Sequence, residues 1–109
     1  MIYRSKKGDT MDNAKFSLLA RKIVYDYAWE HLDKTDGIKF PFDDVYIVWS
    51  CKTLQNNKAM ISTNLPDGMY YEVTYNGDKD EFYLDAYKKF HNQMITESEI
   101  ELTFNGASQ

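Results

Sequence analysis

The sequence holds few of the residues that form disulfides or metal sites. Among its 109 residues there is one cysteine, Cys51, and there are two histidines, His31 and His91. A single cysteine excludes an internal disulfide and a cysteine-based zinc site, and two histidines argue against a histidine-rich metal centre. We therefore expect no metal, no cofactor and a cytoplasmic setting, in which thiols stay reduced.

Long apolar runs and positive charge are also scarce. No apolar stretch approaches the length of a membrane-spanning helix, and the N-terminus has no signal-peptide core, so we expect no membrane partner. Lys and Arg total 13 against 17 Asp and Glu, which gives a formal net charge of −4. Because contacts to DNA phosphates need clustered Lys and Arg, nucleic acid is an unfavoured partner.

Aromatic residues, by contrast, are abundant, at 16% of the chain with nine tyrosines. From residue 45 to residue 90, aromatic and β-branched residues crowd extended runs, and Asn, Asp, Gly and Pro crowd the gaps between them. This pattern predicts an antiparallel meander of four strands: Val45–Leu54, Lys58–Asn64, Met69–Tyr75 and Glu81–Tyr87. The turns are expected at Asn56-Asn57, Pro66-Asp67-Gly68 and Asn76-Gly77-Asp78.

A single long helix is expected before the sheet, from Asp12 to Lys34. Asp12 or Asn13 can cap its first amides, and Asp36-Gly37 supplies the stop. Apolar residues recur three and four positions apart, which places them on one face that we expect to pack on the sheet. That face consists of Phe16, Leu19, Ala20, Ile23, Tyr27 and His31.

The same helix carries a second apolar stripe, roughly opposite the first. The helix stripe consists of Leu18, Tyr25, Trp29 and Leu32. A helix that packs on one sheet needs one apolar face, so the stripe needs a cover. Either the tail or the N-terminal arm of the chain covers it, or it is the interface of a homodimer or a partner protein. The connector residues Phe40 and Phe42 are expected under the sheet edge instead.

The alternation divides the expected sheet into two faces. The face that packs on the helix carries Val45, Ile47, Trp49, Cys51, Ala59, Ile61, Met69, Tyr71, Val73, Tyr75, Phe82 and Leu84. The other face is polar and rich in tyrosine, which is typical of the solvated side of an antiparallel sheet and also suits protein binding. Its candidate interface residues are Tyr46, Tyr70, Tyr83 and Tyr87.

Segments at both ends of the chain differ from the rest. Residues 1–10 are basic and polar, and the codons of Lys6-Lys7-Gly8-Asp9 can contain a purine-rich ribosome-binding sequence just before Met11. We expect residues 1–10 to be a translated leader or flexible arm and residues 11–109 to form one domain. The alternation of residues 99–104 predicts a fifth strand. The expected fold class is therefore α+β, with one long N-terminal helix packed on a four- to five-stranded antiparallel meander.

The sequence contains no recognisable catalytic constellation. Cys51 is expected to point to the core, where a cysteine acts as a small hydrophobe. His31 and Glu30 are consecutive in the helix and therefore diverge. We expect no catalytic residue and no enzymatic activity. A pocket between helix and sheet would favour the alternative of a small ligand-binding or enzymatic domain.

Three segments together suggest a family. Residues 48–59 read VWSCKTLQNNKA, residues 67–78 read DGMYYEVTYNGD, and residues 83–89 read YLDAYKK. From Met11 to Phe90 the chain resembles an uncharacterised family of small proteins encoded by phages and prophages of low-GC Gram-positive bacteria. The tail from His91 to Gln109 departs from the short ending of that family. The resemblance implies an accessory protein in the host cytoplasm that binds a host or phage protein, and it transfers no residue role.

The leading hypothesis is therefore a binding protein that contacts its partner through the helix stripe, the tyrosine-rich face, or both. A homodimer through the helix stripe is a subsidiary expectation. Two alternatives stay open: a protein associated with single-stranded nucleic acid through stacked tyrosines, and an acidic inhibitor of a nucleic-acid enzyme.

Overall fold

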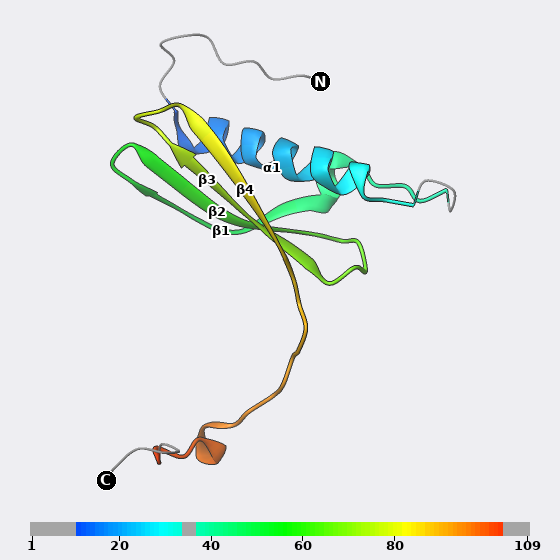
Figure 1. Ribbon diagram of the computed structural model, residues 1–109, viewed down its shortest axis with the longest axis vertical. Coiled ribbons are helices and arrows are strands. Elements are labelled where there is room, and N and C mark those ends of the chain that lie inside the picture. Colours follow the sequence, from blue (N-terminus) through cyan, green and yellow to red (C-terminus); the bar gives the residue numbers. More distant parts are fainter. Residues whose placement is uncertain (1–10, 34–36, 104–109) are drawn as a thin grey trace.

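One helix lies across one face of a four-stranded sheet (Figure 1). The computed structural model describes residues 11–33 and 37–103, so the expected leader at residues 1–10 lies outside the described residues. The elements are α1 (Asn13–Glu30), β1 (Val45–Thr53), β2 (Asn56–Thr63), β3 (Met69–Asn76) and β4 (Glu81–Lys88). The strands pair antiparallel in the order β1-β2-β3-β4, which confirms the predicted α+β fold with an antiparallel meander.

The helix begins as the sequence predicts and ends earlier. The side chain of Asp12 accepts a hydrogen bond from the backbone N–H of Lys15 at 2.7 Å, which caps the first turn. At the other end, the N–H of His31 bonds a carbonyl three residues back at 3.2 Å, so the last turn tightens. The helix therefore stops at Glu30 and not at the predicted Lys34.

The core lies between α1 and the sheet. The buried positions of the helix are mostly four residues apart, and their apolar members are Phe16, Ala20, Val24 and Ala28. Small side chains at the last three let the helix approach the strands closely. The predicted face is confirmed at Phe16 and Ala20, which are buried, and at Leu19, Ile23 and Tyr27, which pack half-buried against the core. Its centre turns toward Val24 and Ala28, and His31 is exposed. The sheet contributes Val45, Ala59, Ile61, Tyr71, Val73 and Tyr75 to the buried core.

A bulge in β1 reverses the predicted faces of the second half of this strand. The pairing of β1 with β2 shifts between Ile47 and Trp49, so Val48 is an extra residue there. A shift of one residue moves every later side chain to the opposite face. Trp49 and Cys51 consequently lie on the face away from α1, where both are exposed. The prediction that these two residues point to the core is wrong.

The turn between β1 and β2 comes earlier than the sequence predicts. Leu54 and Gln55 form it, with Leu54 in the left-handed region at φ +54°, and Asn56 and Asn57 already belong to β2. The turn before β3 is where it was expected. Gly68 there has φ +69°, a conformation that glycine adopts without steric cost.

Beyond β4 the chain leaves the sheet and runs away from it (Figure 1). Residues 91–103 contain a short 3-10 helix, Glu97–Glu99, and no strand. The fifth strand predicted at residues 99–104 is therefore wrong for its described part, and Phe104 lies outside the described residues. None of the helices in the described ranges is both long and apolar enough to cross a membrane.

Candidate functional site

The face of the sheet away from α1 carries a group of exposed large side chains. We call it the outer cluster, and each member exposes between 41% and 52% of its surface: Tyr46, Val48, Trp49, Tyr83 and Tyr87. The helix occupies the opposite face of the sheet (Figure 1). Beside the cluster lies a hollow of about 320 Å³, whose lining includes Tyr46, Tyr70 and Lys89. The members of the outer cluster lie on the edge strands β1 and β4, and the central strands between them carry the Lys58–Glu72 ion pair on the same face.

Strand register brings three of the four predicted interface tyrosines into one row. Tyr46 lies opposite Ser62, which lies opposite Tyr70, which in turn lies opposite Tyr87. The rings of Tyr70 and Tyr87 stack with their centroids 5.1 Å apart. Tyr83 lies on the same face in a different row, so the sequence correctly placed all four residues on one side.

Trp49 is the member of the outer cluster that the sequence analysis missed. It was assigned to the core because strict alternation through β1 would place it there. The run Ile47-Val48-Trp49 was the available signal, since three consecutive large apolar residues break a period of two at the position of the bulge. The bulge therefore adds the largest side chain of the outer cluster.

Negative charge exceeds positive charge among these residues of the outer face. Lys58 forms an ion pair with Glu72 at 3.2 Å, and Asp85 lies on the same face. Lys52 lies on the helix side, where its Nζ donates to the backbone carbonyl of Met11 at 3.0 Å. The face thus has little net positive charge for nucleic-acid phosphates.

Neighbouring acids keep two tyrosines of the outer cluster protonated. The hydroxyl of Tyr83 donates to the carboxylate of Glu81, and this hydrogen bond is the main cause of its raised pKa. Partial desolvation, followed by the charge of Asp85, raises the pKa of Tyr87. Both hydroxyls are therefore hydrogen-bond donors at neutral pH.

The helix stripe already has a cover within the chain. The ring of Tyr25 stacks on Phe40 at 5.4 Å and meets the edge of Phe42 at 5.6 Å, while Trp29 lies 6.1 Å from Phe40. Phe40 is buried, and the guanidinium of Arg21 lies 4.2 Å above the ring of Phe42. The connector thus packs on α1, which differs from both covers that the sequence suggested and from its expected place under the sheet edge.

Leu18 and Leu32, the other members of the stripe, are half-buried. Leu32 packs against the core cluster and lines a cavity near the end of α1. The stripe is therefore split between the connector contact and the cavity, and it does not form one continuous free surface in the monomer.

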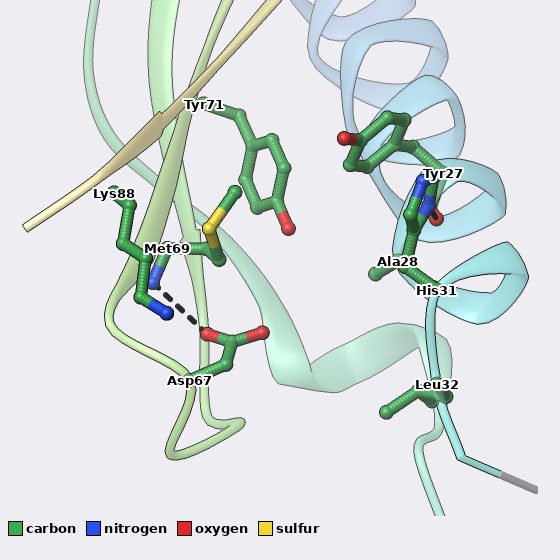
Figure 2. A pocket seen from close by; sticks show the side chains of 8 residues that line it. All are labelled: Tyr27, Ala28, His31, Leu32, Asp67, Met69, Tyr71 and Lys88. Atoms are coloured by element: carbon green, nitrogen blue, oxygen red, sulfur yellow. Dashed lines mark hydrogen bonds between the residues drawn. The ribbon is translucent and has the colours of Figure 1, made fainter.

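A second candidate site is a cavity of about 210 Å³ between the end of α1 and the start of β3 (Figure 2). The helix contributes Tyr27 and His31, the turn before β3 contributes Asp67, and β3 contributes Tyr71. The rings of Tyr27 and Tyr71 meet edge to face with centroids 5.7 Å apart. The carboxylate of Asp67 also accepts the N–H of Met69 at 3.0 Å, which orients it at the cavity mouth.

Cys51 is exposed and lies opposite Lys58 in the register. No group of three or more His, Cys, Asp or Glu side chains within residues 11–33 and 37–103 is arranged to hold a metal ion.

Comparison with known proteins identifies one family. Residues 17–97 match a family described as a family of unknown function, DUF6275. This match spans most of α1, the whole sheet and residues 91–97, so it extends into the tail that was expected to depart from the family. No curated protein and no solved structure matches the chain.

Proposed function

The chain belongs to the DUF6275 family, and from that premise we propose that it is a binding protein that docks onto another protein through the outer cluster. One observation carries the proposal: five large side chains are 41–52% exposed on one sheet face while the helix occupies the other. Exposed aromatic side chains gathered on one face are typical of protein-binding sites.

The chemistry of the face indicates what the partner must present. Tyr46, Val48 and Trp49 offer apolar contact along β1, and the hollow beside them can receive an apolar side chain. The hydroxyl of Tyr83 already donates to Glu81, so the hydroxyl of Tyr87 is the one that requires a hydrogen-bond acceptor from the partner. A partner with an apolar anchor surrounded by carbonyl or carboxylate oxygens fits both requirements.

A phage or prophage accessory role in a low-GC Gram-positive host is the setting that we propose. The resemblance of residues 48–59 and 67–78 supports it, and it implies a host or phage protein as the partner. The action is binding without catalysis, in the host cytoplasm. Single-stranded nucleic acid is a weaker candidate, because Lys58 is paired with Glu72 and Lys52 faces the helix side.

Affinity capture from phage-infected host extracts, followed by binding measurements with the purified partner, tests this proposal. Trp49→Ala combined with Tyr83→Ala should abolish capture, because it removes two ring contacts without touching the core. Ile38→Ala is the matched control, since Ile38 is 40% exposed but lies in the connector. A partner held equally by wild type and by the double variant would contradict the proposed surface.

A further inference from the structure

The cavity between α1 and β3 receives the hydroxyl of a buried tyrosine. Tyr71 is 2% exposed as a residue, and its hydroxyl points into the cavity (Figure 2). Within the described residues this hydroxyl makes no hydrogen bond. A ligand in the cavity can therefore form a hydrogen bond with it in place of water.

The polar lining offers hydrogen-bond acceptors. One carboxylate oxygen of Asp67 accepts a hydrogen bond from the N–H of Met69, and a carboxylate has further acceptor sites beyond this one bond. His31 Nδ1 lies 2.8 Å from the carbonyl oxygen of Tyr27, so this nitrogen donates to that carbonyl. The phenolic oxygen of Tyr71 can also accept.

The negative charge of Asp67 contributes to the electrostatic potential at the hydroxyl of Tyr71. Desolvation, followed by the negative charge of Asp67, raises the pKa of Tyr71 to about 12. The charge of Asp67 favours a cation at this place, whereas desolvation, the larger cause of the shift, penalises a charge of either sign. Lys88 is the cation among the lining residues, and because Asp67 and Lys88 are both exposed, water screens both charges.

Apolar groups complete the lining and set the size of the ligand. Ala28, Leu32 and Met69 contribute the apolar wall. A cavity of roughly 150 Å³ in another protein holds benzene. The volume here, about 210 Å³, suits a body of that size with a polar head.

We propose that this cavity binds a small organic ammonium ion, with its N–H groups toward Asp67 and Tyr71 and its apolar body against Leu32 and Met69. This site is separate from the outer cluster, so the inference goes beyond the proposed docking function. The ammonium can come from a free amine or from a lysine side chain of a polypeptide.

Three ring compounds of similar size and different charge test the proposal on the full chain. Benzylammonium, benzyl alcohol and benzoate are titrated at pH 7, and the chemical shifts of the cavity residues are followed by NMR. We expect saturable shifts with benzylammonium, weaker ones with benzyl alcohol and none with benzoate. Nα-acetyl-lysine amide is titrated in parallel, and its affinity relative to benzylammonium identifies the source of the ammonium.

Substitutions assign the binding to named groups. Asp67→Asn keeps the acceptor for Met69 but removes the charge, and should weaken benzylammonium binding roughly tenfold. Tyr71→Phe should weaken it as well, whereas Lys88→Gln should strengthen it a few-fold because a repelling charge is lost. Asp78→Asn, in the β3–β4 turn, is the control and should leave the affinity unchanged.

Two results would overturn the inference. One is the absence of saturable binding by every ammonium probe. The other is binding of benzoate at least as tight as that of benzylammonium, or a loss of affinity in Lys88→Gln, since either would assign the site to anions. A negative result for the cavity does not affect the docking proposal, because neither Asp67 nor Tyr71 belongs to the outer cluster.

Discussion

At the scale of single residues, Gly77 marks the tightest contact between two turns of the sheet. A Cβ added at this position would lie 2.1 Å from the backbone carbonyl oxygen of Gln55 in the β1–β2 turn. The N–H of Gly77 also donates to the side chain of Asn56 at 3.2 Å. The absence of a side chain at Gly77 is therefore what lets the two turns pack together.

Gly77→Ala should lower the free energy of unfolding by about 1–3 kcal/mol, because one backbone must move away from the other. Chemical denaturation measures this loss. Gly37→Asn is the matched control: Gly37 has φ +64° but nothing within 4 Å of an added Cβ, and asparagine tolerates the left-handed region. Equal losses in both variants would contradict the close contact.

Tyr71 should make stability depend on alkaline pH. Its pKa is raised from 10.0 to about 12 in the folded protein, first by desolvation and then by the charge of Asp67. Between these values the unfolded chain loses the proton first, so the contribution to stability is full below pH 10 and is lost as the pH rises through 12. Asp67 and Tyr27 add negative charge near the hydroxyl, and the other ionisable groups that line the cavity, His31 and Lys88, are both exposed.

This effect is measured by comparing denaturation curves of the wild type and of two variants from pH 9 to pH 12. Tyr71→Phe should show a shallower fall than wild type, because it has no hydroxyl to titrate. Tyr70→Phe, from the opposite face of the same strand, should keep the wild-type slope. If the slopes of all three proteins coincide, the Tyr71 hydroxyl is solvated in solution.

At the scale of elements, β1 shows where alternation stops predicting a sheet. In β2 and β3 the buried side chains alternate strictly, and the sequence placed Ala59, Ile61 and Val73 correctly. In β1 the extra residue at Val48 is a local backbone feature that composition does not encode. One such insertion is sufficient to misplace every later side chain of the strand, including Trp49.

Exposure of Cys51 gives this bulge a chemical readout. An aromatic disulfide reagent should label Cys51 in the native protein at nearly the rate seen after unfolding. In a Cys51→Ser background, Ala59→Cys is the matched control, because Ala59 is fully buried and should react only when the protein opens. If Cys51 in the native protein does not react with the reagent, its side chain is buried, which would contradict the bulge and support the uninterrupted alternation that the sequence predicted.

The connector is an element that sequence reasoning placed wrongly. Tyr25 and Trp29 were correctly recognised as an apolar stripe, but periodicity does not say which distant segment covers a helix face. Arg21 fixes the position of the connector through two hydrogen bonds. Its Nε donates to the carbonyl of Val45 at 2.8 Å, and its Nη2 donates to the carbonyl of Phe42 at 3.2 Å. These bonds tie the start of β1 and the connector to α1.

Phe40→Ala should therefore cost about 3–5 kcal/mol of unfolding free energy, since Phe40 is 2% exposed and contacts both rings of the stripe. Phe42→Ala should cost less, because Phe42 is half-buried. Thermal and chemical denaturation of the two variants compare them. A loss at Phe42 that equals or exceeds the loss at Phe40 would mean that the stripe is covered by something else.

The cavity could not be predicted from the sequence for a related reason. Its parts come from the end of a helix, a turn and a strand, and each has a sufficient local explanation. Tyr27 and Tyr71 fit the core pattern, and Asp67 fits the turn. Only the tertiary packing shows that the hydroxyl of Tyr71 points into a cavity.

At the scale of the whole molecule, the body and the C-terminal arm differ in how they bury apolar residues. The body covers its apolar side chains between α1 and the sheet. Residues 90–103, the C-terminal arm, are exposed throughout, and the exposed fractions reach 95% at Phe90, 77% at Met94 and 81% at Leu102. Exposed apolar side chains at this density favour contacts with other molecules.

A variant that ends at Lys89 should keep the stability of the full chain to within about 0.5 kcal/mol, because the C-terminal arm adds no buried side chain to the core. It retains the last contact of the body, the hydrogen bond from the N–H of Lys89 to the carbonyl of Gly68 at 2.8 Å. Light scattering at increasing concentration should show less self-association in this variant than in the full chain, since the exposed apolar side chains are gone. A large loss of stability on truncation would instead mean that the C-terminal arm packs on the body in solution, where the outer cluster and the edge of β4 are the surfaces open to it.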